Sequence, residues 1–228
     1  MKKNEMKKIV IACTKKWFLE NKASKKFLDK KSIIIIKKKN QLNLNYIKKI
    51  NPYYIFFPHW SFKVKKQILN NYNCICFHTA PLPYGRGGSP IQNLISRNFK
   101  KTNLCALKMT DEIDGGPIYK KEKLSLNGNL DEIFNRISLL IIKIINDLLK
   151  KNITPKKQVG KILKFKRRNK RQSEITETNI NKIYDKIRML SSKEYPNAFL
   201  KYKNYKIYFS QATLKKNMII CNAKIFKN

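Results

Sequence analysis

The chain has 228 residues, of which 42% are hydrophobic, so its composition excludes an intrinsically disordered protein and allows one folded core with an appendage. Its formal net charge of +37 comes almost entirely from lysine and is spread over the whole length. Proteins that bind phosphate groups more often cluster arginine, so we interpret the charge as a compositional bias and keep nucleic-acid binding as the alternative.

The cysteines and histidines favour a reduced, cytoplasmic protein without a metal site. Five cysteines, at positions 13, 74, 76, 105 and 221, form no CxxC pair, and the chain has only two histidines. The longest apolar segment, Ile137 to Leu149, is interrupted by polar residues and is too short to span a bilayer. We therefore expect neither metal ligands nor an association with membranes.

Short apolar runs alternate with helical segments in the first half of the chain. Strands are predicted at 9–13, 33–36, 53–57 and 74–77, and helices at 17–28, 46–50 and 64–69. The run from Ile33 to Ile36 is apolar on both faces of its strand, which is typical of a sheet covered on both sides. This alternation predicts an α/β fold with a parallel sheet.

Capping signals mark the helices of the second half. Ser89 and Pro90 open one helix, because serine can cap and proline suits the first helical position. Asn129 and Glu132 form a capping box that starts a helix running to about Lys150. The remaining predicted elements are strands at 104–109 and 118–126, a basic connector at 152–173, a helix at 179–190, and a strand pair at 205–209 and 218–225.

Candidate chemistry follows the fourth predicted strand. His78 stands at the end of this strand, before a loop rich in proline and glycine, and Asp114 lies in an acidic loop one strand later. A histidine held opposite a carboxylate can act as a general base near neutral pH. In the intervening loop, Arg86 and Gly87 form either a contact for a phosphate-bearing substrate or a turn that redirects the chain. No GxGxxG motif follows the first strand, so a nicotinamide cofactor is not indicated.

This segment resembles the folate-dependent formyltransferase family, which includes methionyl-tRNA, glycinamide ribonucleotide and sugar N-formyltransferases. The family pattern of Asn-x-His, a Leu-Pro turn, Arg-Gly and a helix-opening Pro is matched by His78, Leu82-Pro83, Arg86-Gly87 and Pro90. The later Asp-x-Gly-Pro-Ile loop of the family is matched by Asp114 to Ile118. The two motifs together are more specific than either alone, and the likeness extends over residues 7 to 210.

The resemblance implies a Rossmann-like, mostly parallel sheet with helices on both faces, followed by a short C-terminal helix and strand pair. Residues 1–151 would form the catalytic domain, and residues 152–228 a connector with a small C-terminal extension. His78 and Asp114 would be catalytic, and Arg86 and Gly87 would contact the substrate. The segment expected to bind the cofactor comprises Trp60, Ser61, Phe62 and Lys63, together with Glu112 and Ile113.

One position departs from the family pattern. Cys76 stands where the family has an asparagine whose amide donates to the oxygen of the transferring formyl group. A thiol is a weak donor, and losing one preorganised donor costs on the order of a hundredfold in rate. We keep Cys76 as a third candidate catalytic residue.

We predict an N-formyltransferase that uses 10-formyltetrahydrofolate. The expected acceptor is a primary amine, that of a nucleotide-linked amino sugar. Methionyl-tRNA is the alternative acceptor. We rank it second because we associate the enzymes that act on it with a larger C-terminal barrel domain, and the chain ends too soon for one. A second alternative is a non-catalytic basic protein that binds nucleic acid on a degenerate formyltransferase scaffold.

Overall fold

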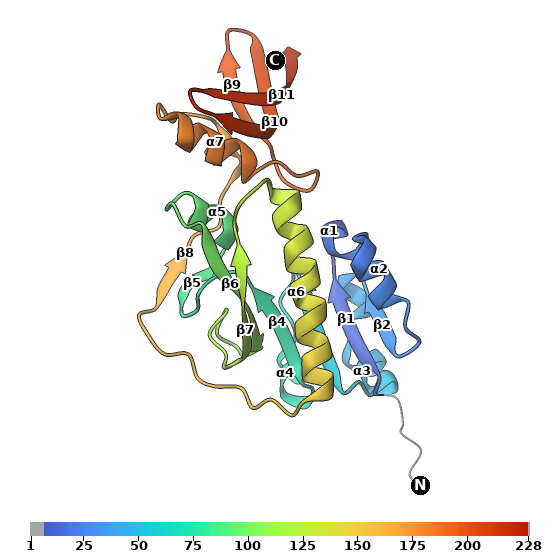
Figure 1. Ribbon diagram of the computed structural model, residues 1–228. Helices are drawn as coiled ribbons and strands as arrows, with labels where there is room; N and C mark the ends of the chain where they lie inside the picture. The colour runs from blue at the N-terminus through green and yellow to red at the C-terminus, as the bar shows by residue number, and fades with distance from the viewer. Residues whose placement is uncertain (1–6, 228) are drawn as a thin grey trace.

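A computed structural model describes residues 7–227, and a six-stranded sheet forms its centre (Figure 1). In spatial order the strands are β2 (Ile33–Ile36), β1 (Ile9–Cys13), β3 (Tyr54–His59), β4 (Cys74–His78), β6 (Lys101–Lys108) and β7 (Ile118–Ser125). The first four are parallel, whereas β6 and β7 run antiparallel to their neighbours. The α/β fold with a mostly parallel sheet is confirmed.

The alternation of side chains along β1 explains why both faces of the sheet are covered. Ile9, Ile11 and Cys13 point into one hydrophobic cluster, and Val10 and Ala12 into another. Helices α1 (Lys16–Leu19), α2 (Lys22–Leu28), α5 (Pro90–Ile95) and α6 (Leu130–Lys150) contribute to the first cluster. Helices α3 (Leu44–Ile50) and α4 (Lys66–Asn71) contribute to the second.

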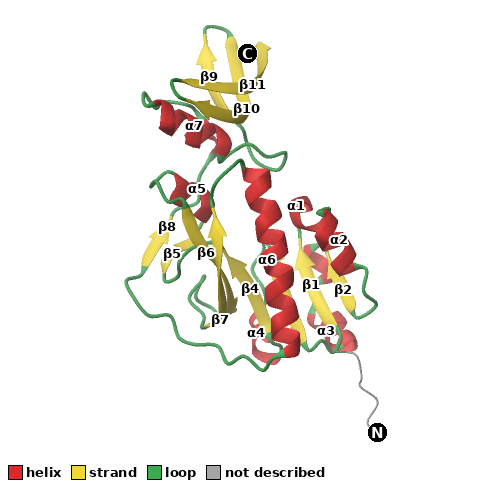
Figure 2. Ribbon diagram, in the orientation of Figure 1, coloured by secondary structure: helices red, strands yellow, loops and turns green. Residues whose placement is uncertain are grey.

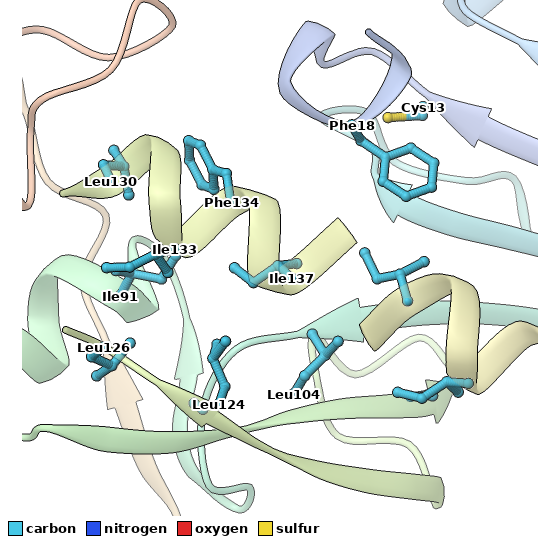
Figure 3. Packing of buried hydrophobic residues seen from close by; sticks show 14 of the residues in the cluster. Cys13, Phe18, Ile91, Leu104, Leu124, Leu126, Leu130, Ile133, Phe134 and Ile137 are labelled. Carbon is cyan, nitrogen blue, oxygen red and sulfur yellow. The ribbon is translucent and has the colours of Figure 1, made fainter. Parts of the chain in front are cut away.

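Helix α6 is the largest element of the first cluster and begins at the predicted capping box. The Asn129 side-chain oxygen accepts a hydrogen bond from the backbone N–H of Glu132 at 3.0 Å. In return, the Glu132 carboxylate accepts one from the backbone N–H of Asn129 at 2.8 Å. Its apolar stripe then packs over the sheet, with Ile133 and Ile137 near Leu104 and Leu124 (Figure 3). Burying one such side chain stabilises the fold by about 2 kcal/mol.

Two helices replace the single helix predicted at 17–28. The break falls at Asn21, whose side-chain oxygen accepts hydrogen bonds from the backbone amides of Ala23 at 3.0 Å and Ser24 at 3.3 Å. Asparagine competes well for such N-cap positions, so it starts a new helix within an otherwise helical pattern. The prediction of one continuous helix was therefore wrong.

A short parallel pair, β5 (Tyr84–Gly87) and β8 (Leu163–Phe165), was not predicted. β5 lies in the loop that follows His78, and β8 lies in the segment expected to be a connector. Neither strand is long enough to show an alternating pattern in the sequence. Pro90 opens α5 as predicted, but Ser89 has a φ of +49° and its side chain makes no cap hydrogen bond.

The C-terminal part consists of one helix and an antiparallel sheet of three strands rather than the predicted two (Figure 2). These elements are α7 (Ile180–Arg188), β9 (Ala198–Tyr202), β10 (Tyr205–Lys215) and β11 (Met218–Lys227). Two short 3-10 turns, Lys39–Gln41 and Lys170–Ser173, complete the elements. Within residues 7–227 no helix is both long and apolar enough to cross a membrane.

Candidate active site

A cavity of about 1100 Å³ opens at the carboxyl ends of the parallel strands. Lys15 follows β1, His59 ends β3 and His78 ends β4, and all three line the cavity. Ligand sites of open α/β sheets form at this edge, because the loops that follow the parallel strands converge there. The predicted site residues that line it are Trp60, Ser61, Phe62, Lys63, Cys76, His78, Gly87, Glu112, Ile113 and Asp114.

His78 and Asp114 lie together at the centre of the cavity wall. The Nδ1 atom of His78 is 3.4 Å from Oδ2 of Asp114, and only 7% of the His78 side chain is exposed. The Asp114 carboxylate also accepts the backbone N–H of Gly87 at 2.9 Å. Asp114 adopts a φ of +53°, a left-handed conformation that turns its loop back toward β4.

Strand β5 holds both members of this pair. The Gly85 carbonyl oxygen is 2.7 Å from Nε2 of His78, and the Gly87 amide donates to Asp114. Gly87 has a φ of +101°, and a Cβ atom there would lie 2.5 Å from the Phe165 carbonyl oxygen of β8. Glycine at this position therefore permits the close pairing of β5 with β8.

The two hydrogen-bond acceptors around His78 define its role. A carbonyl oxygen only accepts, so Nε2 carries a proton toward Gly85, and Nδ1 faces a carboxylate. Both ring nitrogens of His78 therefore face oxygen atoms, and a substrate must displace one of these contacts to reach either nitrogen.

Cys76 lies on the same strand two residues before His78 and also lines the cavity. Burial and the nearby Asp114 carboxylate raise the pKa of the Cys76 thiol well above its ordinary value. Its sulfur contacts the Leu107 carbonyl oxygen at 3.9 Å. Cys76 is therefore a neutral thiol at physiological pH, and its one weak hydrogen-bond donor is directed to Leu107.

Arg86, which we expected to contact the substrate, is not among the residues that line the cavity. Its side chain is 4% exposed, and its guanidinium binds the Glu112 carboxylate at 2.5 Å. It also donates to the Gln158 side chain, from Nε at 3.1 Å and from Nη2 at 2.9 Å. Gln158 lies in the predicted connector, where no sequence pattern marked it, and it is a site residue that the sequence did not reveal.

One side of the cavity suits a flat aromatic ring system such as a pterin. Trp60 and Phe62 contact each other edge to face, with ring centroids 5.5 Å apart, and Phe57 and Leu69 extend this apolar wall. The indole N–H of Trp60 is buried without a hydrogen-bond partner among the described residues. The apolar faces of Trp60 and Phe62 would pack against such a ring, so the residues present fit the folate group.

Further aromatic residues, Trp17 and Phe134, also line the cavity. Trp17 stacks on Phe134 at 4.6 Å between ring centroids, and His59 lies edge-on to Trp17. The C-terminal part contributes Leu190, Glu194, Tyr195 and Pro196 to the cavity lining. The Glu194 carboxylate accepts the backbone N–H of Trp17, which joins the two parts of the chain at the cavity rim.

Comparison with known proteins assigns the chain to a family. Methionyl-tRNA formyltransferase from Campylobacter lari is 31% identical over 215 residues, which cover 91% of this chain and 69% of the relative. The chain belongs to the folate-dependent formyltransferase family. A solved structure of methionyl-tRNA formyltransferase from Clostridium thermocellum is 44% identical, with a TM-score of 0.91 over 98% of this chain and 100% of that one. Residues 170–226 match the family described as the methionyl-tRNA formyltransferase C-terminal domain.

More distant members of the formyltransferase family share the fold alone. A 4-N formyltransferase from Francisella tularensis is 19% identical, with a TM-score of 0.63 over 88% of this chain and 94% of that one. Some curated relatives are longer, and the chain spans 42% of the methionyl-tRNA formyltransferase from Rickettsia prowazekii. The enzyme class of the chain is folate-dependent formyl transfer, and the prediction of an enzyme of this family is confirmed.

Proposed function

We propose that the chain transfers a formyl group from 10-formyltetrahydrofolate to the α-amino group of methionyl-tRNA. The observation that carries the choice of acceptor is the match of residues 170–226 to the C-terminal domain of methionyl-tRNA formyltransferases. These residues include Leu190, Glu194, Tyr195 and Pro196, which form one wall of the cavity. The part of the chain that resembles this domain thus lines the cavity in which the acceptor amine would react.

The chain's own residues supply the chemistry around the reacting groups. The bound folate supplies the formyl group, and the aromatic wall of Trp60 and Phe62 would hold its ring. Ser61, Lys63, Glu112 and Ile113 lie beside this wall as further cofactor contacts. An incoming amine must lose a proton, and negative charge develops on the formyl oxygen. A protonated His78 would stabilise this charge, and Asp114 would hold His78 and take up the amine's proton through a water. This proton would pass to the folate nitrogen as its bond to the formyl carbon breaks.

A basic and aromatic surface on the C-terminal sheet supports an RNA acceptor. Tyr202, Tyr205 and Phe226 are 60%, 43% and 55% exposed. The strand register places Tyr202 and Tyr205 on one face of this sheet with the exposed Lys227, and Phe226 on the other face with the exposed Lys201 and Lys224. Lysines bind phosphates and exposed aromatic rings stack on unpaired bases, so this surface is suited to a nucleic acid.

The amino-sugar acceptor that we expected from the sequence is the weaker candidate. That expectation depended on the short C-terminal part, yet the Clostridium thermocellum structure is matched over its whole length and carries the methionyl-tRNA name. The 4-N formyltransferase is a distant neighbour that supports the fold alone. The family assignment and the His78–Asp114 pair also disfavour a non-catalytic RNA-binding protein.

A direct assay tests the proposed acceptor. The purified chain is incubated with 10-formyltetrahydrofolate and either charged methionyl initiator tRNA or nucleotide-linked amino sugars. We expect formylmethionine after ester hydrolysis, detected by mass spectrometry, and none with His78→Ala. Formylation of an amino sugar with no formylmethionine would contradict the proposal, and the uncharged tRNA serves as a blank.

A further inference from the structure

We propose that Gln158 is a positioning residue that fixes the Asp114 loop for catalysis. This inference rests on the proposed function, because it concerns the same site. The Nε2 atom of Gln158 donates to the carbonyl oxygens of Asp114 and Gly116, both at 2.8 Å. Its Oε1 atom accepts from Arg86 at 2.9 and 3.1 Å. One side chain therefore holds the backbone on both sides of the turn that presents the catalytic carboxylate.

The Asp114 loop needs such a restraint because its backbone is strained. Asp114 has a φ of +53°, a left-handed conformation that a non-glycine residue keeps only where the surrounding structure holds it. Its carboxylate must also reach both the Gly87 amide and His78. If the carbonyl contacts of Gln158 are lost, the loop is free to turn Asp114 away from His78.

The amide group of Gln158 has only one orientation that satisfies its partners. The Arg86 guanidinium can only donate, and the two carbonyl oxygens can only accept. Glutamate has the same shape and would keep the contact with Arg86, but it has no N–H groups for the carbonyls. Gln158→Glu therefore removes the loop contacts while it preserves the size of the side chain and its acceptor atoms.

Gln158 differs from its neighbours in the connector. Val159 is 88% exposed and Lys157 is also exposed, whereas Gln158 is half-buried with both ends of its amide bonded. Arg86, to which it is joined, lies between Gly85 and Gly87, the two residues that hold His78 and Asp114. The contacts of Gln158 thus reach the catalytic pair from two directions.

Kinetics with methionyl-tRNA give the first test, on Gln158→Met and Gln158→Glu, with Val159→Ala as the matched control. We expect both Gln158 variants to lower kcat by about 10- to 100-fold with KM unchanged within about twofold, since misplacing a catalytic group costs this much. Val159→Ala should keep the kcat of the original chain. A folded Gln158 variant with unchanged kcat would overturn the proposal.

Nitrogen NMR gives a second test that needs no formyl transfer. The chain has only two histidines, so ¹⁵N-histidine labelling with a His59→Gln reference assigns the His78 signals. Each Gln158 variant should shift the His78 signals toward the positions seen in the Asp114→Asn variant. In double variants that also carry Asp114→Asn, the Gln158 substitution should cause no further shift. Unchanged His78 signals would refute the positioning role. If the His78 signals respond as expected but the unsubstituted chain does not formylate methionyl-tRNA, the positioning role stands and the acceptor that we propose is refuted.

Discussion

At position 76 a thiol takes the place of the amide that the family pattern has beside its histidine. The raised pKa of Cys76 keeps it protonated, so it contributes neither a negative charge nor a strong donor to the cavity. The catalytic environment of this chain therefore depends mainly on His78 and on the carboxylate that holds it. The consequence can be measured by substituting the two side chains separately.

Turnover should distinguish the contributions of Cys76 and His78. Cys76→Asn should keep or raise kcat, because the amide is a stronger donor, and Cys76→Ala should lower kcat by less than about threefold. His78→Ala should lower it by at least about 100-fold, because it removes the group proposed to stabilise the charge on the formyl oxygen. All are measured with the same methionyl-tRNA and folate donor. Loss of activity in both Cys76 variants, with the fold intact by circular dichroism, would show that the thiol takes part in the reaction.

A second residue-scale prediction concerns His59. Burial, and then the positive charges of Lys15 and Arg167, lower the pKa of His59 from 6.5 to about 4. Folding therefore favours the neutral ring, and this contribution to stability is present above pH 6.5 and is lost as the pH falls toward 4. The free energy of unfolding should fall by up to about 3 kcal/mol over this window.

Urea titrations at pH 7.5 and pH 4.5 of the original chain and of His59→Gln test this point. Carboxylates also titrate in this range, so the comparison between the two proteins isolates the histidine. The variant should lose less stability on acidification than the original chain. An equal loss in both proteins would mean that His59 is not buried in its neutral form.

At the scale of elements, α6 depends on the capping box at its N-terminus. Asn129→Ala removes the acceptor for the Glu132 amide and should lower the free energy of unfolding by about 1 kcal/mol. Asn129→Asp keeps an acceptor and adds a charge that suits a helix N-terminus, so it should cost less. Thermal unfolding of both variants gives the measurement. Equal stability of Asn129→Ala and the original chain would show that Glu132 and water replace the cap.

The elements also show what the sequence could and could not predict. Runs such as Ile9 to Cys13 and signals such as the Asn129 capping box are local, and the structure confirms both. β5, β8 and β9 were missed because each is short and is stabilised by a partner strand rather than by its own pattern. Gln158 was missed for the same reason: its partners at Asp114 and Arg86 lie 44 and 72 residues away.

At the scale of the whole molecule, the positive charge can be tested for function. Lys203 lies in the β9–β10 turn of the C-terminal part and Lys224 lies on β11, whereas Lys48 and Lys49 lie on α3 at the far end of the molecule (Figure 1). Replacing Lys203 and Lys224 by alanine should weaken tRNA binding about tenfold at low salt and reduce the salt slope by about two. The Lys48 and Lys49 double variant should change binding less.

Binding isotherms at several salt concentrations measure both quantities. Equal losses of tRNA affinity in the two double variants would mean that binding depends on the net charge and not on the position of the lysines. This result would agree with a compositional bias. A selective loss at Lys203 and Lys224 would correct our interpretation of the charge and support the RNA surface on the C-terminal sheet.

The pairing of β5 with β8 has a consequence for the order of events during synthesis. All six strands of the central sheet lie before residue 126, so this sheet can form on the ribosome while the connector is still being made. β5 has no partner strand until Leu163–Phe165 emerges, and Arg86 has no Gln158. A nascent chain that stops before the connector would thus have a folded core and an unassembled catalytic pair. Activity should therefore appear late in translation, after compactness and protease resistance of the core.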